Sequence, residues 1–256
     1  MSVSVSCATL DLGRLEDVKN AGFDGWEVMA EDSQTLNKKT LSIIDAAYHS
    51  YGLKISIHTP ISDMNIASLN YPIWRETIHQ IKKSIAKASD YANIFVIHPG
   101  YISPMASRNL DRALKKNNDS LESIANFARD LGVKATVENM VNDNFLMGKY
   151  PEEIKNMMNN EIGFTFDVGH ANTTNTIDEF LKMKIDHVHV HDNNGKDDEH
   201  LILGLGNIDW KHVIGELKGY KGDFVVEAND FEASISSLHY LKRFQLSLRK
   251  LARRIR

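Results

Sequence analysis

Residues 162–170 read IGFTFDVGH, an apolar and aromatic run that ends on an acid, Asp167, followed by a histidine, His170. Short runs rich in Val, Ile, Phe and Thr are typical of β-strands. The same pattern recurs on both sides of this stretch, from one end of the chain to the other. It predicts eight strands: Ser2–Cys7, Gly25–Val28, Lys54–His58, Asn93–His98, Lys134–Glu138, Ile162–Asp167, Asp186–His191 and Asp223–Glu227.

Longer amphipathic segments separate these runs, and they predict helices. The clearest are Ile73–Tyr91 and Leu110–Leu131, where apolar residues recur at helical spacing. Strands that alternate with helices indicate an α/β protein with a parallel sheet, and eight such units in 256 residues predict a (β/α)8 TIM barrel. Because no linker or low-complexity tract divides the chain, we expect a single domain over residues 1–256.

Composition narrows the class of protein. With 42% hydrophobic and 25% charged residues, the chain has the profile of a soluble globular protein. It contains no apolar stretch near the roughly 18–20 residues that span a bilayer, and its N-terminus does not resemble a signal peptide. Cys7 is the only cysteine, so disulfides within the chain and cysteine-based zinc sites are excluded, and we expect a cytoplasmic protein.

Charge is unevenly distributed along the chain. Of the 30 lysines and arginines, seven follow residue 241, which leaves 23 in residues 1–241 against all 34 acids. This acidic body disfavours a nucleic-acid partner. The basic end predicts an amphipathic helix at about 233–256 with a solvated basic face, because Leu241, Phe244, Leu248 and Leu251 recur beside the charges at helical spacing.

Six of the eight predicted strands, the third to the eighth, end on ionisable side chains. These residues are His58, His98, Glu138, Asp167, His191 and Glu227, with His170 shortly after the sixth strand. The carboxyl ends of barrel strands meet at one face, so we expect these side chains to converge there. Carboxylates and imidazoles that are buried together are costly unless they are paired, and a divalent cation pairs with both kinds. The sequence therefore predicts a metal site, although a hydrogen-bonded polar core is the alternative for any single histidine.

The seventh strand and the loop after it carry further candidates. His187, His189 and His191 alternate with valines and so share one face of the strand. Asp198 and His200 lie two residues apart in the following loop and suit a cation. Lys196 in the same loop is a candidate contact for a phosphate or carboxylate, although a solvated lysine is the plainer interpretation.

As a set, these motifs resemble the xylose-isomerase-like TIM barrels. This superfamily includes sugar and sugar-phosphate isomerases and epimerases, and also the endonuclease-four enzymes, AP endonuclease family 2. The resemblance covers nearly the whole chain and rests on GFDGWE, HTP with NIAS downstream, HPG, EN, DVGH, HVHVHD, DEH with GLG, and the final strand glutamate, in that order.

The resemblance implies one to three divalent ions per chain. The metal site of the sugar epimerases would comprise Glu138, Asp167, His189 and Glu227, which suits Mn²⁺, Mg²⁺, Co²⁺ or Zn²⁺. The endonucleases add His58 and His98, which form a second site with Glu138. They also add a third site made by His170, Asp198 and His200. Histidine-rich outer sites of this kind favour zinc.

Two reactions follow from the resemblance. In a metal-dependent isomerase or epimerase of a sugar, sugar phosphate or related polyol, Glu138 and Glu227 act as base and acid on opposite faces of the substrate beside its carbonyl, with His170 assisting. Glu27, His191 and Lys196 would then contact substrate. A structural role is the alternative for Glu27. This isomerase or epimerase is the function that we predict.

The second reaction is cleavage of DNA at abasic sites by zinc-bound hydroxide, which the complete set of nine ligands favours. The loops after the second and third strands, MAEDSQ and TPISDMNIAS, lack the basic and aromatic side chains that would hold and bend a duplex. A dehydratase or lyase acting on a hydroxy acid is a further alternative, and a noncatalytic scaffold ranks last. No membrane partner is expected. The expectation of a homodimer rests only on the general frequency of dimers among protein oligomers.

Overall fold

The computed structural model describes residues 1–158 and 161–254, with the side chains of the last helix described as far as Phe244. Eight parallel strands form a closed barrel in sequence order, and the first strand pairs with the eighth. The predicted (β/α)8 barrel is confirmed. The strands are β1 Ser2–Ser6, β2 Gly25–Met29, β3 Lys54–His58, β4 Ala92–Ile97, β5 Lys134–Glu138, β6 Gly163–Asp167, β7 His187–Val190 and β8 Asp223–Glu227.

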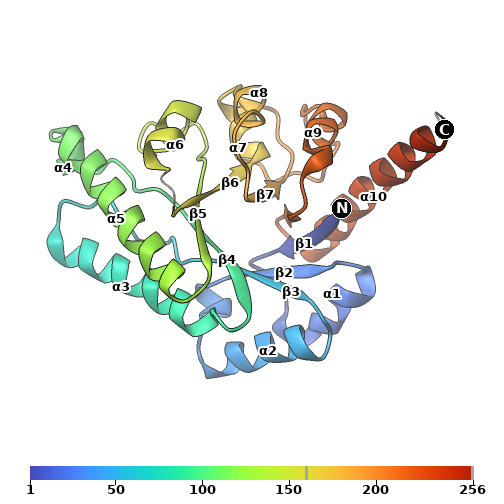
Figure 1. Ribbon diagram of the computed structural model, residues 1–256, viewed down its shortest axis with the longest axis horizontal. Helices are drawn as coiled ribbons and strands as arrows, with labels where there is room; N and C mark the ends of the chain where they lie inside the picture. The colour runs from blue at the N-terminus through green and yellow to red at the C-terminus, as the bar shows by residue number, and fades with distance from the viewer. Residues whose placement is uncertain (159–160, 255–256) are drawn as a thin grey trace.

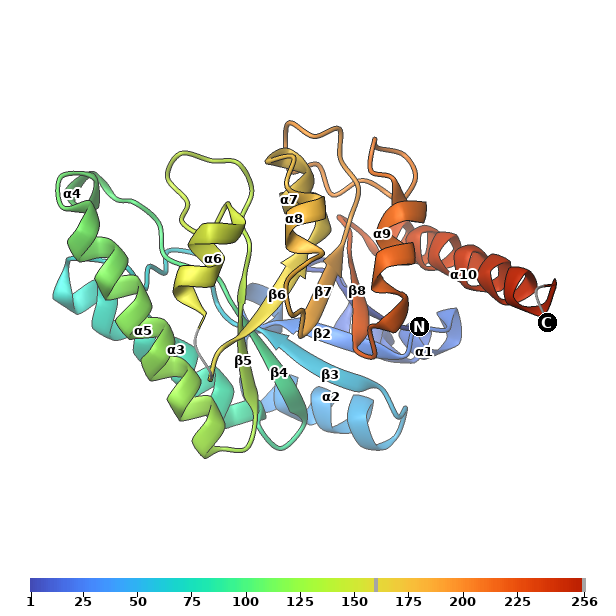
Figure 2. The ribbon, with the colours of Figure 1, turned by 45° about the horizontal axis from the view of Figure 1, so that its top comes forward.

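Helices surround the barrel, and α3 and α5 lie side by side on its outside (Figures 1 and 2). The helices are α1 Leu15–Ala21, α2 Lys38–His49, α3 Tyr71–Ala88, α4 Pro104–Ser107, α5 Leu110–Asp130, α6 Pro151–Met157, α7 Val168–Thr173, α8 Ile177–Phe180, α9 Trp210–Glu216 and α10 Phe231–Arg254. Three short 3₁₀ turns accompany them: η1 Leu12–Arg14, η2 Asp32–Gln34 and η3 Leu217–Gly219.

The predicted element bounds agree closely with the structure. Every strand is found within one residue of its expected ends. The helix α3 begins two residues earlier than expected because Pro72 is accommodated in its first turn, where no backbone donor is needed. It ends at Ala88, three residues before the expected Tyr91. The helix α5 stops at Asp130, close to Gly132, whose φ of 75° favours glycine.

The two faces of each strand differ in polarity. Phe164 and Phe166 of β6 belong to the apolar core, together with helix residues such as Ile85 and Leu121. The alternate residue Thr165 points into the barrel, where its hydroxyl donates to Thr136 Oγ1 at 2.7 Å. The barrel interior is therefore polar, whereas parallel strands buried on both faces usually read as apolar runs. The main apolar core lies between the sheet and the helices.

Long loops follow β5 and β7 at the same end of the barrel (Figure 2). This end is the carboxyl end of the strands, where the predicted polar residues lie. The helix α10 begins after β8 and projects beyond the barrel (Figure 1). Of the seven basic residues in the predicted basic face of this helix, only Lys242 and Arg243 have described side chains. Lys242 Nζ donates to the carbonyl oxygen of Gly22 at 2.9 Å. The side chains after Phe244 and residues 255–256 lie outside the described part of the chain. Among the described helices, none is both long and apolar enough to cross a membrane.

Candidate metal centre

A cavity of about 370 Å³ opens at the carboxyl ends of the strands. Its walls include the side chains of seven of the predicted site residues: His58, His98, Glu138, His170, Asp198, His200 and Glu227. Most of these belong to different strands or to the loops that follow them, so the barrel brings together residues that are far apart in sequence. The predicted convergence of polar strand ends is therefore present in the structure.

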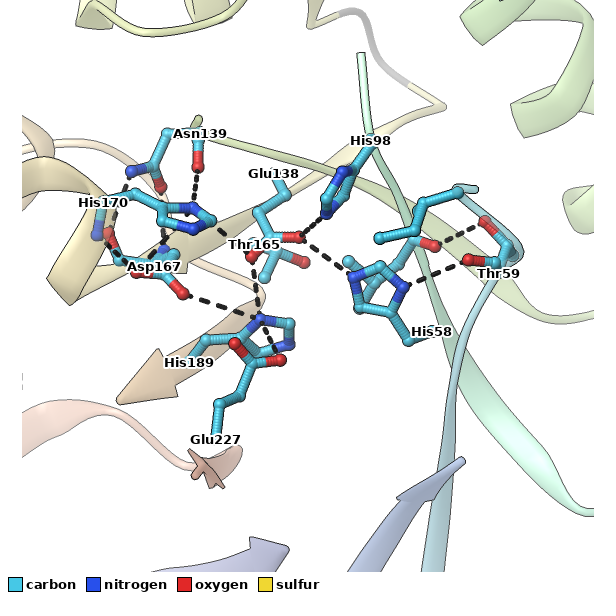
Figure 3. Close-up of polar contacts among 12 residues, drawn as sticks. His58, Thr59, His98, Glu138, Asn139, Thr165, Asp167, His170, His189 and Glu227 are labelled. Carbon is cyan, nitrogen blue, oxygen red and sulfur yellow. Dashed lines mark hydrogen bonds and ion pairs between the residues drawn. The ribbon is translucent and has the colours of Figure 1, made fainter. Parts of the chain in front are cut away.

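Three carboxylates surround one imidazole nitrogen at the base of this cavity (Figure 3). Nδ1 of His189 lies 2.9 Å from Glu138 Oε1, 3.3 Å from Glu227 Oε1 and 3.9 Å from Asp167 Oδ2. One ligand atom from each of the four residues lies within 4.8 Å of the others. Asp167 Oδ2 is buried and has no hydrogen-bond partner among the described residues. Such a set of oxygen and nitrogen donors fits a divalent cation, which would partner all four at once. We call these four residues the inner group.

Glu138 also contacts a pair of histidines on its other side. Its Oε2 lies 3.3 Å from His58 Nε2 and 3.0 Å from His98 Nε2. Nδ1 of His58 lies 3.1 Å from the carbonyl oxygen of Thr59, which favours the tautomer that leaves Nε2 free to bind a cation. His58, His98 and Glu138 thus form a second candidate group, and one oxygen of Glu138 lies in each group.

The electrostatics of these groups follow from the contacts. Burial alone would raise the pKa of Glu138, but the imidazoles of His189, His58 and His98 hold the pKa well below its usual value. Burial likewise opposes the charged form of His58, yet Glu138 raises the pKa of His58 to about 9. Burial lowers the pKa of His98. Without a cation, the carboxylates rely on protonated imidazoles for their counter-charge.

The third group differs from the expected one. Asp198 lies 3.3 Å from His170 Nε2 and 3.2 Å from His200 Nε2, as the resemblance implied. The mutually close group about Asp198, however, consists of His191, Asp198 and His200, and His170 groups instead with Asp167 and His191. The His191 ring stacks on that of His200, with centroids 4.0 Å apart, and its Nε2 lies 3.4 Å from Asp198 Oδ1.

His191 therefore lies among candidate ligands, although the sequence predicted a contact to substrate. Its side chain is fully buried, and neither ring nitrogen has a hydrogen-bond partner in the described part of the chain. The ring lies directly against Gly169, where an added Cβ would come within 2.0 Å of it. Glycine at position 169 thus leaves room for this imidazole, because any side chain there would occupy the space of the ring.

The other two predicted substrate contacts lie away from the cavity walls. Glu27 is fully buried beneath the inner group, where it contacts His187, His189 and Ser56. Burial opposes its charged form, but His189 and His187 hold the pKa of Glu27 well below its usual value. Lys196 is exposed on the loop after β7 and is not among the residues that line the cavity.

Two residues that support the site were given no role of their own in the sequence analysis, although they belong to the motifs EN and HVHVHD. Asn139 donates to the carbonyl of Asp167 and accepts from its amide, and its own carbonyl lies 2.8 Å from His170 Nδ1. Asp192 is buried and accepts from Gly204 N at 2.7 Å and Trp210 Nε1 at 2.9 Å. Asp192 thereby fixes the loop that carries Asp198. In the sequence, Asn139 directly follows Glu138 and Asp192 directly follows His191. This position beside a candidate site residue is the signal that could have identified them.

Comparisons with known proteins agree with this architecture. The sequence profile described as xylose isomerase-like TIM barrel matches residues 15–244. A protein of Methanocaldococcus jannaschii, the uncharacterized protein MJ1311, is 35% identical over 243 residues, which cover 90% of this chain and 83% of that protein.

Solved structures are similar as well. A crystal structure described as a D-tagatose 3-epimerase-like protein is 31% identical, with a TM-score of 0.91, and the match covers 98% of this chain and 100% of the other. Endonuclease IV of Thermus thermophilus is 18% identical, with a TM-score of 0.69, over 96% of this chain and 98% of the other. At 18% identity, the likeness shows the fold alone.

Proposed function

Because the chain belongs to the xylose isomerase-like TIM barrel family, we propose that it is a divalent-metal-dependent isomerase or epimerase of a sugar, sugar phosphate or related polyol. The observation that carries the proposal is the inner group, in which three carboxylates and one imidazole meet at the base of the cavity. The similarity to a D-tagatose 3-epimerase-like protein supports it.

A cation held by the inner group would polarise a carbonyl oxygen and make the neighbouring C–H more acidic. The residues of the chain then have to move protons. Glu138 and Glu227 both reach the cavity, one from the end of β5 and one from the end of β8. Two carboxylates at separate positions can take a proton from one face of a substrate and return one to the other.

His170 is placed to orient the substrate. Its Nδ1 lies 2.8 Å from the carbonyl oxygen of Asn139, which favours a proton on that nitrogen. Its Nε2 lies 3.3 Å from Asp198 Oδ2, and the side chain lines the cavity. Burial opposes the charged form of His170, but Asp167 and Asp198 hold the pKa of His170 well above its usual value. A protonated ring that is fixed in this way presents Nε2–H as a donor to a substrate oxygen.

The size and lining of the cavity favour a small polyol. Its volume of about 370 Å³ lies within the range of roughly 300–1,000 Å³ that is typical of small-molecule sites. Ser6 and Thr9, two residues with hydroxyl groups, line the cavity together with the carboxylate and imidazole residues. In the described part of the chain, no lysine or arginine lines this cavity. Groups of this kind match the hydroxyls of a sugar.

One observation favours the alternative function, a zinc-dependent abasic-site endonuclease. Two further histidine and carboxylate groups flank the inner group, one about His58 and His98 and one about Asp198 and His200. A phosphodiesterase with several ions uses such groups to hold both the attacking and the leaving oxygen. An isomerase needs only the inner group.

Metal content and two assays test the proposal. Untagged protein would be analysed for bound ions by plasma mass spectrometry, then incubated with ketoses and their phosphates in D₂O and, separately, with an abasic-site duplex. We expect exchange of a substrate C–H for deuterium, detected by proton NMR, without strand cleavage. Close to three zinc ions per chain together with strand cleavage would overturn the proposal in favour of the endonuclease.

The double variant Asp198→Ala, His200→Ala separates the two functions further. We expect at most about a tenfold loss of deuterium exchange, because the inner group is untouched. A three-metal phosphodiesterase would lose one ion and nearly all of its rate. His212→Ala serves as the control for loss of a histidine, since His212 pairs with Asp178 at 2.6 Å outside the site.

A further inference from the structure

Glu27 of β2 takes no part in the reaction as described, yet it lies directly beneath the inner group. Its side chain is fully buried and it does not line the cavity. Its Oε2 accepts from Ser56 Oγ at 2.8 Å and lies 2.7 Å from His187 Nε2. Its Oε1 lies 3.0 Å from Nε2 of His189, the single imidazole of the inner group.

The two ring nitrogens of His189 face opposite partners. Nδ1 faces the carboxylates of Glu138 and Glu227, whereas Nε2 faces Glu27. A neutral imidazole carries its proton on one nitrogen only, and a metal binds the other. If Nδ1 is to bind a cation, the proton of His189 must therefore be on Nε2.

Glu27 Oε1 is the group that can accept this proton. Both Oε1 and His189 Nε2 are buried, and neither has an aligned hydrogen bond among the described residues. Buried polar atoms of this kind are normally paired. Since the two atoms lie 3.0 Å apart, a slight adjustment of the ring completes a hydrogen bond between them.

We infer that Glu27 is a positioning residue that keeps His189 in the tautomer and orientation in which Nδ1 faces the metal centre. A carboxylate behind a metal-binding histidine fixes the ring and strengthens it as a ligand. This role takes the place of the substrate contact expected from the sequence. It rests on the metal site of the proposed function, and not on the identity of the substrate.

A competing interpretation is that Glu27, His187 and His189 themselves bind an ion, since their ligand atoms also lie within 4.8 Å of one another. The contacts of Glu27 argue against it. Its Oε2 already accepts two hydrogen bonds, from Ser56 and His187, as a supporting carboxylate does. The number of bound ions separates the two interpretations.

The test measures binding of metal without substrate. Metal-free wild type, Glu27→Gln and the control Glu153→Gln would be titrated with Zn²⁺ and with Mn²⁺ against a chromophoric chelator. Glu153 lies on α6 and accepts a hydrogen bond from Lys149 N, just before that helix, so the control makes the same chemical change away from the metal centre. We expect Glu27→Gln to bind the same number of ions about 10- to 100-fold more weakly, with the control unchanged.

Other results would overturn the inference in distinguishable ways. Unchanged affinity in Glu27→Gln removes the positioning role, and loss of one whole ion with the remaining affinity intact makes Glu27 a ligand. A wild-type chain that binds no divalent ion removes the proposed function itself, together with this inference.

A measurement on the unsubstituted protein is independent of whether the variant folds. Nitrogen NMR of ¹⁵N-histidine-labelled, zinc-loaded protein reports which ring nitrogen of each histidine carries a proton. We expect His189 to carry it on Nε2 with Nδ1 bound to zinc. A proton on Nδ1, or zinc on Nε2, overturns the inference.

Discussion

Glu138 and Glu227, the two glutamates proposed to move protons, are held very differently. The Glu138 side chain is 1% exposed, and its oxygens lie within 4 Å of four imidazoles, those of His189, His58, His98 and His170. The Glu227 side chain is 12% exposed and has one contact of this kind among the described residues, with His189 at 3.3 Å. Glu227 is therefore the freer carboxylate and the better candidate for exchanging a proton with substrate.

We expect Glu227→Gln to lower the turnover number at least about 100-fold, because an amide cannot serve as a base. The barrel should stay folded, since the substitution keeps the shape of the side chain. Deuterium exchange into substrate measures the first effect, and circular dichroism with thermal melting measures the second. Glu232→Gln, on the exposed face of α10, is the matched control. Full activity in Glu227→Gln would exclude Glu227 from the mechanism.

The strand β7 and the residue after it place three histidine side chains at different depths in the barrel. Residues two apart on a strand lie about 6–7 Å apart on the same face. His187 thus lies deepest and contacts Glu27, His189 lies in the inner group, and His191 follows the strand and approaches Asp198. The alternating valines Val188 and Val190 face the apolar core.

The loops that follow β2 and β3 are joined by one carboxylate. Glu31 accepts hydrogen bonds from Ile61 N and Ser62 N, both at 2.9 Å, and from Ser62 Oγ at 2.8 Å. Ile61 lines the cavity. Burial alone would raise the pKa of Glu31, but these hydrogen bonds hold it below its usual value of 4.5.

A lowered pKa in the folded state makes the contribution of Glu31 to stability dependent on pH. The contribution is complete above the unfolded value of about 4.5 and is lost as the pH falls through the lower folded value. At pH 7 we expect Glu31→Gln to lower the free energy of unfolding by about 0.5–1 kcal/mol, a small effect because the group is partly exposed.

Urea unfolding of wild type and Glu31→Gln at pH 7 and at pH 4 measures this difference. The gap between the two proteins should narrow at pH 4. Glu76→Gln, on the exposed face of α3, is expected to match wild type at pH 7. A gap that stays constant or widens on acidification would contradict the assignment.

On the scale of the whole molecule, the candidate metal centre draws on six consecutive strands. Its residues come from the ends of β3 to β8: His58, His98, Glu138, Asp167, His189 and Glu227. Without a cation, the carboxylates among them lie close together in a buried site. A cation would therefore link the strands across the open end of the barrel.

We expect removal of the metal to lower the melting temperature. A ligand present at 100 times its dissociation constant stabilises the folded state by about 2.7 kcal/mol, which corresponds to roughly 5–10 °C for a chain of this size. Calorimetry of zinc-loaded, chelator-treated and reloaded protein measures the effect, with metal analysis on each sample. Identical melting of loaded and metal-free protein would show that no ion links the strands.

Local pattern in the sequence was enough for the architecture. Runs such as IGFTFD and KATVE define their strands by composition alone, and their regular spacing implies the closed parallel barrel. The ionisable residues at the ends of six of these runs identified the end of the barrel that carries the candidate site. Both features are local or periodic, so they can be read without knowing any contact between distant residues.

The grouping of those side chains was decided only by the tertiary structure. Glu27 and His187 are 160 residues apart in sequence, and the closure of the barrel brings them together. The depth of a side chain depends on the stagger of the strands, which composition does not specify. That depth places Glu27 beneath the cavity and His191 beside Asp198. The sequence thus determined the fold and the end of the barrel at which the candidate site lies, and three-dimensional packing decided which residues meet there.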